Sequence, residues 1–324
     1  MKRMYWIGDM QGNSGPAIVN KSYFNYLKDD FVFCKKNGKL YRIFHFFLHL
    51  LFMKTILVSG FSALNYYFII IAKFFHKRTI YLMHGYMTLE MKYQATFNKK
   101  MMLIEKKLLF SVDKIICVSG FFCKYMKEEL PAISNKFTFV NNGIERFCCE
   151  NDIDSYSHDF VIISTGGGVK QKNNLKVCEA ISMLHDKNIK YIVIGNEGID
   201  GSKIKQFVFV TFFDNLPHSD VLKQMQRSNL YIQNSYFETF GLSILEAVQC
   251  GCDVLISRNI GVKDVLNDLK QEDFINDNNN AFEIAEKIKN KINTYKKHQA
   301  KKYSVNDKYL WYNSSKELLK KCGE

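Results

Sequence analysis

Short apolar runs alternate with segments of helical periodicity along the chain. In the first half, the runs that predict strands are Met4–Ile7, Phe31–Phe33, Thr55–Ser59, Thr79–Met83, Lys114–Val118 and Phe137–Val140. In the second half they are Phe160–Ser164, Lys190–Ile194, Phe207–Thr211, Leu230–Gln233, Asp253–Ile256 and Asp273–Ile275. Continuous apolar runs separated by helices are typical of parallel sheets that are buried on both faces. The pattern therefore predicts an α/β protein with two doubly wound parallel-sheet domains.

The length and one polar break locate these domains. A chain of 324 residues is too long for one ordinary core and suits two. Residues 150–159 are polar and aperiodic, so we expect a linker between a domain of residues 1–150 and a domain of residues 151–300. Helical periodicity over Lys296–Lys321 predicts a C-terminal helix, and we expect residues 301–324 to pack back toward the first domain. The apolar anchors of this helix are Tyr303, Leu310, Trp311, Leu318 and Leu319.

Several classes of site are absent from the sequence. The nine cysteines include no C-x-x-C pair, so free thiols in a reducing cytosol are expected. The D-x-D at Asp152–Asp154 lies in the linker, and we predict neither a required metal nor a cofactor. There is no P-loop and no G-x-G-x-x-G fingerprint, which argues against ATPases and NAD enzymes. The N-terminal apolar run breaks at Gly8-Asp9, so no signal peptide is predicted.

The positive charge is concentrated in the first half. Of the net charge of +13, residues 1–150 carry +12, from 22 Lys and Arg against 10 Asp and Glu. The same half contains the apolar, aromatic segment 40–53, which is flanked by basic residues and is too short to span a bilayer. A helix buried in the core would explain the apolar residues of this segment but not the basic residues around it. The one-sided charge favours an anionic surface, either a membrane or a phosphate-bearing acceptor. No nucleic-acid-binding motif is present, so no nucleic acid partner is predicted.

Glycine-rich loops follow several predicted strands. Gly8 to Gly15 lies between the first strand and a helix that begins near Ala17, where backbone N–H groups and the helix dipole could hold an anion. His84-Gly85 ends the fourth strand, and a histidine in that position faces the expected cleft between the domains. Tight turns also require glycine, and an isolated histidine is more often structural, so both features have an alternative explanation.

The most specific stretch is residues 234–251. A strand ends, a loop carries Glu238, and a helix runs from Gly241 to its C-terminal Gly251. Glu246 interrupts the apolar residues of that helix, and a buried carboxylate needs hydrogen-bond donors or a partner charge. Sugar or ribose hydroxyls would serve, and so would a lysine. The N–H groups at Gly241–Ser243 would suit a phosphate.

The spacing of Glu238 and Glu246 resembles the E-x7-E motif of retaining glycosyltransferases of family four, which have the GT-B fold of two Rossmann-like domains. Weaker likenesses occur in the expected order along most of the chain: Val118-Ser119-Gly120, Val140–Ile144, Gly166–Asn173 and Gly195–Gly198. The resemblance implies that Glu238 holds the donor sugar's hydroxyls and Glu246 the ribose hydroxyls. It implies that Lys172 neutralises the departing diphosphate, helped by the N–H groups of Gly241 and Leu242.

The resemblance also assigns roles in the first half. His84 would contact the sugar near the anomeric carbon, and the loop at Gly15 would contact the diphosphate. The chain departs from the family at Gly167, where the family has an arginine beside the diphosphate, and Lys170 is the nearby cation that would replace it. Lysine is a point charge and lacks the planar fork of arginine.

Two functions from different classes remain open at this point. One is a retaining, metal-independent transferase that moves a hexose or N-acetylhexosamine from a nucleotide-diphosphate sugar, with UDP favoured, to a glycan or lipid-linked acceptor. Its location would be cytoplasmic and peripheral at the inner membrane face, in capsule or exopolysaccharide synthesis, and the Lys- and Asn-rich composition is that of an AT-rich bacterium. The other is a non-catalytic, glycosyltransferase-like partner subunit, which Gly167 favours and an intact set of charged residues opposes.

Overall fold

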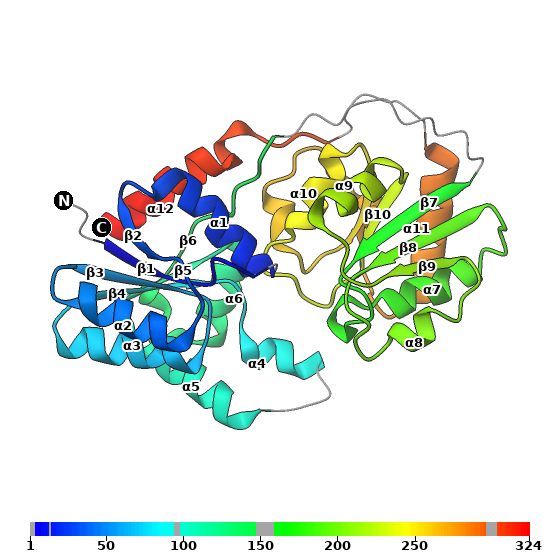
Figure 1. Cartoon of the computed structure of the whole chain (residues 1–324). Coiled ribbons are helices and arrows are strands. Elements are labelled where there is room, and N and C mark those ends of the chain that lie inside the picture. The colour runs from blue at the N-terminus through cyan, green and yellow to red at the C-terminus, as the bar shows by residue number, and fades with distance from the viewer. Residues whose placement is uncertain (1–3, 13, 94–97, 147–158, 296–302) are drawn as a thin grey trace. The chain divides into compact units, whose positions relative to one another are not determined.

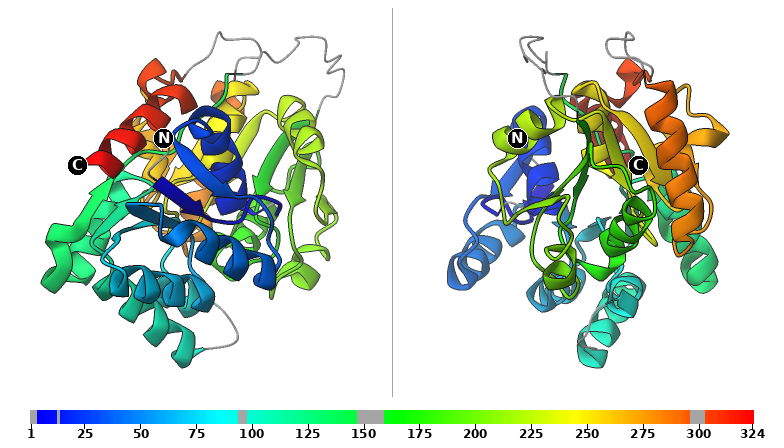
Figure 2. Two further views of the ribbon diagram at one scale, coloured as in Figure 1. Left: turned by 60° about the vertical axis from the view of Figure 1, so that its left-hand side comes forward. Right: turned by 90° about the vertical axis from the view of Figure 1, so that its right-hand side faces the viewer.

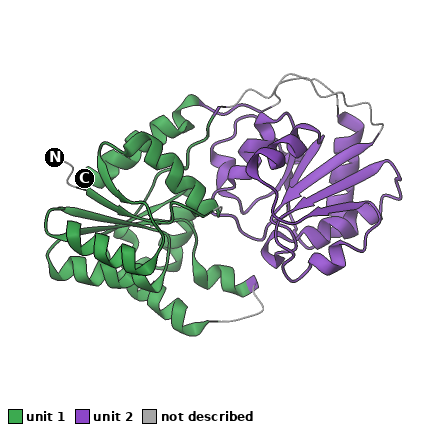
Figure 3. Cartoon of the chain, viewed as in Figure 1, with its two compact units in different colours: residues 1–92, 96–145, 307–324 green, residues 93–95, 146–306 purple. Residues whose placement is uncertain are grey.

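A computed structural model describes residues 4–12, 14–93, 98–146, 159–295 and 303–324 (Figure 1). These residues form two compact units (Figure 3). Unit 1 comprises residues 1–92, 96–145 and 307–324, and unit 2 comprises residues 93–95 and 146–306. The linker predicted at 150–159, including the D-x-D at Asp152–Asp154, lies almost entirely outside the described residues. The prediction that no metal is required stays a prediction.

Unit 1 is built on a six-stranded parallel sheet in the order β2-β1-β3-β4-β5-β6. Its strands are β1 (Met4–Ile7), β2 (Phe31–Cys34), β3 (Thr55–Ser59), β4 (Arg78–Met83), β5 (Lys114–Cys117) and β6 (Phe137–Phe139). Its helices are α1 (Gly15–Leu27), α2 (Lys39–Leu50), α3 (Ala63–Phe74), α4 (Met87–Glu90), α5 (Lys99–Ser111), α6 (Gly120–Glu129) and α12 (Trp311–Gly323). Helices cover both faces of the sheet, which explains the continuous burial of β3 and β4 (Figure 1).

Unit 2 repeats this design with the order β12-β11-β10-β7-β8-β9. Its strands are β7 (Phe160–Thr165), β8 (Ile189–Ile194), β9 (Val210–Phe213), β10 (Leu230–Gln233), β11 (Asp253–Ser257) and β12 (Phe274–Ile275). Its helices are α7 (Asn174–Ser182), α8 (Gly201–Ile204), α9 (His218–Gln226), α10 (Leu242–Gln249) and α11 (Ala281–Thr294). The predicted fold class, with two doubly wound parallel sheets, is confirmed.

The C-terminal segment differs from its prediction. The helix begins at Trp311, and residues 303–306 are not helical. Tyr303 is buried in unit 2, where its hydroxyl bonds to Asp253 and Asp273, so it cannot belong to a continuous helix with Trp311 in unit 1. Helix α12 packs beside α1 in unit 1 (Figures 1 and 2), and Trp311 contacts the ring of Tyr23 at 5.1 Å between centroids.

Strand β9 (Val210–Phe213) also differs, because it begins three residues later and ends two residues later than the predicted run Phe207–Thr211. The apolar residues Phe207 and Phe209 pack against the core of unit 2 from the turn between α8 and β9, so their hydrophobicity reflects burial although neither lies within the strand. Among the described residues, no helix is both long and apolar enough to cross a bilayer.

Candidate functional site

The loop after β7 explains why glycine stands at position 167. Gly166 and Gly167 have φ of 94° and 57°, a region that favours glycine. A Cβ on Gly167 would lie 2.0 Å from the carbonyl oxygen of Asn196, in the loop after β8. The two loops therefore contact each other through their backbones. An arginine at this position would require both loops to move.

Lys172 and Glu238 form an ion pair, although they are 66 positions apart in the chain. Lys172 ends the short turn Lys170–Lys172 after β7, and Glu238 lies in the loop between β10 and α10. Their side chains are 24% and 17% exposed, respectively. Gln233, the last residue of β10, donates from Nε2 to the same Glu238 oxygen at 3.0 Å. The structure thus brings together two residues that the sequence predicted to act on the donor.

The loop that carries Glu238 is held on both sides by backbone contacts. The Tyr236 amide donates to Gln171 at 3.0 Å, and Gln171 Nε2 donates to the Phe237 carbonyl at 2.7 Å. The Glu238 amide donates to the carbonyl of Asn259 at 2.9 Å. Lys172 and Glu238 are therefore attached to segments that are themselves cross-linked by hydrogen bonds.

Helix α10 begins at Leu242, one residue after the predicted start at Gly241, which is its N-cap. Gly241 has φ of 102° and provides no side chain to cap the helix. The first N–H groups of any helix lack intrahelical acceptors, and the helix dipole places partial positive charge there. The N–H of Leu242 thus lies at an end that suits a negatively charged group. At the other end, Gly251 has φ of 89° and follows the last turn, which confirms its predicted role.

Glu246 lies in the middle of α10 and is half-buried, with 18% of its side chain exposed. Its Oε1 is 2.8 Å from Nε2 of His218, the first residue of α9. This hydrogen bond raises the pKa of His218 against the opposing effect of burial. The partner of Glu246 in the structure is thus a histidine, whereas the sequence suggested sugar hydroxyls or a lysine. His218 was missed because it carries no motif, and only its bond to Glu246 identifies it.

Lys170 and Gly15 are the more exposed members of the predicted set. Lys170 lies on the same turn as Lys172. Gly15 is the first residue of α1, where Ser14 caps the helix by accepting from the Ala17 amide at 3.4 Å.

The sequence predicted that the amides of the turn before Gly15 are available to an anion, but two of them already bond to Asp9. Oδ1 of Asp9 accepts from the amides of Gln11 and Gly12 at 2.9 and 2.8 Å and from Nδ2 of Asn37 at 2.5 Å. Burial alone would raise the pKa of Asp9, and these bonds hold it below its ordinary value. The carboxylate of the chain itself therefore occupies part of this turn, and only its end at Gly15 remains a candidate for the diphosphate.

His84 follows β4 and is tied to a polar chain inside unit 1. Ser59 Oγ donates to Asn20 Oδ1 at 2.5 Å, so the 2.8 Å contact between Ser59 and His84 uses a proton on Nε2 of His84. Asn20 in turn donates to the Asp9 carbonyl at 3.0 Å. Burial lowers the pKa of His84 to about 4, so the ring is neutral at pH 7. His84 can contact a hydroxyl in that form but cannot supply a proton from a charged ring.

Each unit carries part of the predicted set. Lys170, Lys172, Glu238, Gly241, Leu242 and Glu246 belong to unit 2, and Gly15 and His84 belong to unit 1. Within unit 2, carboxylates, ammonium groups and a helix N-terminus are available for hydroxyls and phosphates.

Unit 2 is also the part of the chain that matches a known protein family. Residues 150–308 match the family model described as "Glycosyl transferases group 1", a range that includes every unit 2 residue of the predicted set. A probable sucrose-phosphate synthase of Thermosipho melanesiensis is 24% identical over 204 residues, which cover 58% of this chain and 48% of that protein. The chain thus spans about half the length of the curated relative it matches.

Solved structures share the fold over the whole chain. HepE of Anabaena in complex with UDP and glucose has a TM-score of 0.72 at 12% identity and covers all of both chains. The lipopolysaccharide outer core galactosyltransferase WaaB in its apo form has a TM-score of 0.67 at 14% identity, over 98% of each chain. The family match thus covers residues 150–308, just under half of the chain, and the solved structures show that the chain has the GT-B fold.

Proposed function

We propose that the protein is a retaining, metal-independent glycosyltransferase. It moves a hexose or N-acetylhexosamine from a nucleotide-diphosphate sugar, with UDP favoured, to a glycan or lipid-linked acceptor. The observation that carries the proposal is the Lys172–Glu238 pair in the segment that matches the family. The HepE structure contains UDP and glucose, which supports UDP as the carrier of the donor sugar.

In the proposed donor step, the ion pair separates. Without a donor, Lys172 and Glu238 neutralise each other, which avoids two unpaired charges in a half-buried place. When the donor binds, Lys172 turns to the diphosphate and Glu238 accepts from hydroxyls of the sugar. As the sugar–phosphate bond breaks, negative charge grows on the diphosphate and positive charge on the sugar ring. The preorganised ammonium group of Lys172 and the N–H of Leu242 stabilise the negative charge on the diphosphate. The Glu238 carboxylate stabilises the positive charge on the sugar ring.

The nucleotide is proposed to bind through Glu246. Its Oε1 is held by His218, so the carboxylate is fixed in place while Oε2 is directed to the ribose hydroxyls. His218 is a positioning residue in this proposal.

His84 and Gly15 are proposed to contribute from unit 1. The ring of His84 is neutral at pH 7 and its Nε2 contacts Ser59, so we propose that it forms a hydrogen bond with a sugar hydroxyl without bringing a charge. Transfer needs no nucleophilic side chain, because the acceptor hydroxyl attacks from the face that the diphosphate leaves, which retains the configuration.

An apolar face on unit 1 supports a membrane-located acceptor. Helix α2 and the turn after it expose a stripe of large apolar side chains: Leu40, Ile43, Phe44, Phe47, Leu48, Leu51 and Phe52. The adjacent α3 and its C-cap expose Tyr67, Ile70, Phe74 and Phe75, and the two helices touch where the ring centroids of Phe46 and Phe68 lie 4.5 Å apart. We call these exposed residues the α2–α3 face. So many neighbouring exposed apolar side chains are unusual on a protein that contacts only water.

The charges around this face indicate an anionic bilayer as its partner. Lys35, Lys36 and Lys39 are exposed at the start of α2, and Lys54 is exposed after it. Apolar side chains between basic residues are the arrangement of helices that lie in the membrane interface. Arg42 lies close to these lysines in the sequence, but it donates to Asn65 Oδ1 at 2.5 Å and is half-buried. We propose that the α2–α3 face binds the inner surface of the cell membrane in cell-surface polysaccharide synthesis.

The alternative is a non-catalytic partner subunit. An exposed Glu246, or a Lys172 with no contact to the site, would have favoured it. Both side chains are half-buried, and each has a charged or hydrogen-bonding partner in unit 2. These observations favour the enzyme.

The proposal is tested by donor turnover. Purified protein is incubated with UDP-glucose and UDP-N-acetylglucosamine without metal, and release of UDP is followed. Lys172→Met and Glu238→Gln are expected to slow release about 100-fold or more, because each removes a charge that acts on the transition state. The matched control is Lys176→Met, which removes another lysine of unit 2 that is paired with a glutamate, Glu179. Equal rates in all three variants would contradict the proposal.

A further inference from the structure

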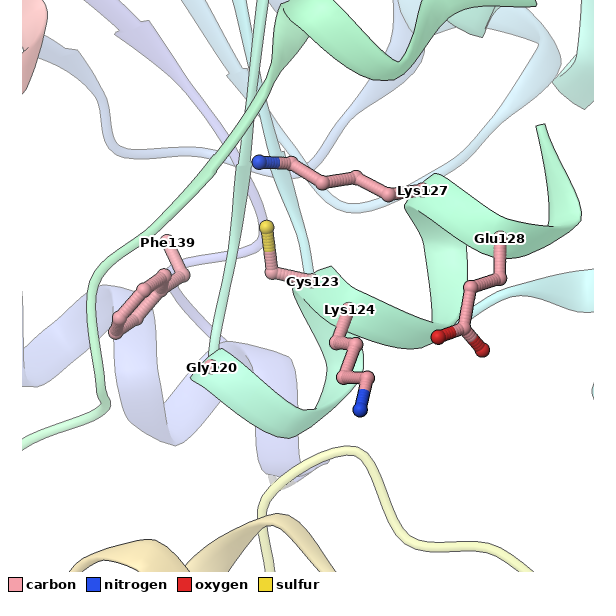
Figure 4. Close-up of a pocket in the computed structure, with 6 residues that line it drawn as sticks. All are labelled: Gly120, Cys123, Lys124, Lys127, Glu128 and Phe139. Atoms are coloured by element: carbon pink, nitrogen blue, oxygen red, sulfur yellow. The ribbon is translucent and has the colours of Figure 1, made fainter. Parts of the chain in front are cut away.

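A cavity of about 340 Å³ lies at the start of α6 in unit 1 (Figure 4). Its lining residues are Gly120, Cys123, Lys124, Lys127, Glu128 and Phe139. They come from α6 and from the end of β6. The proposed transfer reaction uses none of them.

Two thiols meet beside this cavity. Cys117 is the last residue of β5 and is fully buried, and Cys123 lies one turn into α6 and lines the cavity. Their side chains are hydrogen-bonded to each other. Lys127 is four residues after Cys123, so both lie on one face of the helix, and in Figure 4 the lysine side chain extends past the Cys123 sulfur.

The pKa values of the two thiols are shifted in opposite directions. The hydrogen bond from Cys117, together with the charge of Lys127, lowers the pKa of Cys123 against the opposing effect of burial. Burial, and then the bond to Cys123, raises the pKa of Cys117. The hydrogen bond from Cys117, the nearby ammonium group of Lys127 and the open cavity therefore all favour the deprotonated form of Cys123. A thiolate is the reactive form of cysteine.

Other described cysteines have different surroundings. Burial raises the pKa of Cys34 and of Cys178, and it raises the pKa of Cys322 to about 12. Cys252 lies 3.1 Å from the carbonyl oxygen of Met225, to which its thiol donates. Thiols of this kind are slow nucleophiles.

We propose that Cys117 and Cys123 form a peroxide-sensitive pair that closes into a reversible disulfide. The Cys123 thiolate attacks one oxygen of a hydroperoxide, the O–O bond breaks, and the leaving oxygen takes a proton from solvent. Cys123 is then a sulfenic acid, oxidised by two electrons. The Cys117 sulfur attacks the Cys123 sulfur, the S–S bond forms, and the hydroxyl group leaves as water with the Cys117 proton.

The position of the pair gives it access to the acceptor side of the enzyme. Cys117 is paired in the sheet with Met83, the residue directly before His84. A disulfide would tie this end of β5 to α6 and alter the loops at the edge where His84 lies. This consequence for transfer rests on the proposed function, whereas the thiol chemistry does not depend on it.

The test uses the full chain with Cys148→Ser and Cys149→Ser, because these two neighbouring cysteines could pair with other thiols. The protein is treated with hydrogen peroxide, blocked with N-ethylmaleimide and analysed by peptide mass spectrometry. We expect a Cys117–Cys123 disulfide that dithiothreitol reverses. In Cys117→Ser, we expect a dimedone adduct at Cys123. The absence of both products in folded protein would overturn the proposal.

Alkylation rates test the thiolate without any oxidant. In unmodified protein at pH 7.5, iodoacetamide is expected to label Cys123 roughly tenfold faster than Cys322. Lys127→Met should slow labelling of Cys123 several-fold, because it removes the ammonium group beside the sulfur. Lys124→Met is the matched control on the same helix and cavity, and it should leave the rate within about twofold. Equal labelling of Cys123 and Cys322, or no effect of Lys127→Met, would overturn the assignment.

Discussion

Replacing two aromatic residues of the α2–α3 face should release the protein from membranes. Phe44 and Phe47 are 67% and 50% exposed, so changing both to serine removes apolar surface without opening a cavity in the core. A phenylalanine side chain presents about 200 Å². The two exposed portions together amount to roughly 230 Å², worth about 6 kcal/mol if fully buried at ~25 cal/mol per Å².

An interfacial helix sinks only to the boundary between headgroups and acyl chains, so about half of that value is realistic. About 3 kcal/mol corresponds to a binding constant roughly 100-fold weaker. The assay is co-sedimentation with vesicles that contain anionic lipid, at low salt. Thermal unfolding of the same variant should be unchanged, since both side chains are largely solvated already.

The matched control is Phe282→Ser in unit 2. Phe282 is 66% exposed, nearly the same as Phe44, but lies outside the α2–α3 face. It should bind vesicles as well as the unchanged protein does. If Phe44→Ser/Phe47→Ser binds as tightly as Phe282→Ser, the α2–α3 face does not bind membranes, and the exposed apolar residues need another explanation.

Three further predictions concern stability. Burial lowers the pKa of His84 from 6.5 to about 4, so on acidification the unfolded chain binds a proton before the folded protein does. The free energy of unfolding should therefore fall by up to about 3 kcal/mol as the pH drops from 6.5 to 4. Denaturant titrations of His84→Gln should lack this loss. Gly167→Ala should lower the melting temperature more than Gly251→Ala, because both have positive φ but only the first meets a carbonyl oxygen. Lys291→Met should cost about 3–5 kcal/mol, because it removes the ammonium group that neutralises the buried carboxylate of Asp273, and a melting temperature close to that of the unchanged protein would contradict this.

Much of the fold could be predicted because parallel strands buried on both faces leave continuous apolar runs. Thr55–Ser59 and Leu230–Gln233 are found with the predicted bounds. The prediction failed where burial and strand pairing separate, as at Phe207, whose hydrophobic side chain packs from a turn. It also failed at Tyr303, because the sequence does not reveal that this residue bonds to two carboxylates of unit 2.

The sequence predicted which residues belong to the candidate site, but it did not predict which of them contact each other. Glu238 and Lys172 could be proposed from the motif, yet their pairing joins loops 66 positions apart and depends on the strand order. His218 carries no motif and is identified only by its bond to Glu246. The charge pattern indicated an anionic surface, but only the structure separates the exposed Lys39 from Arg42, which is half-buried against Asn65.

The central claim is that unit 2 holds a nucleotide-diphosphate sugar. The most direct test is calorimetric titration of the purified protein with UDP, GDP and dTDP in the absence of metal, repeated with Glu246→Ala and with Glu179→Ala as the control. We predict micromolar binding of UDP that weakens at least tenfold in Glu246→Ala and is unchanged in Glu179→Ala, because Glu246 is the proposed ribose contact. Binding of none of the three nucleotides would contradict the claim and favour the non-catalytic partner subunit.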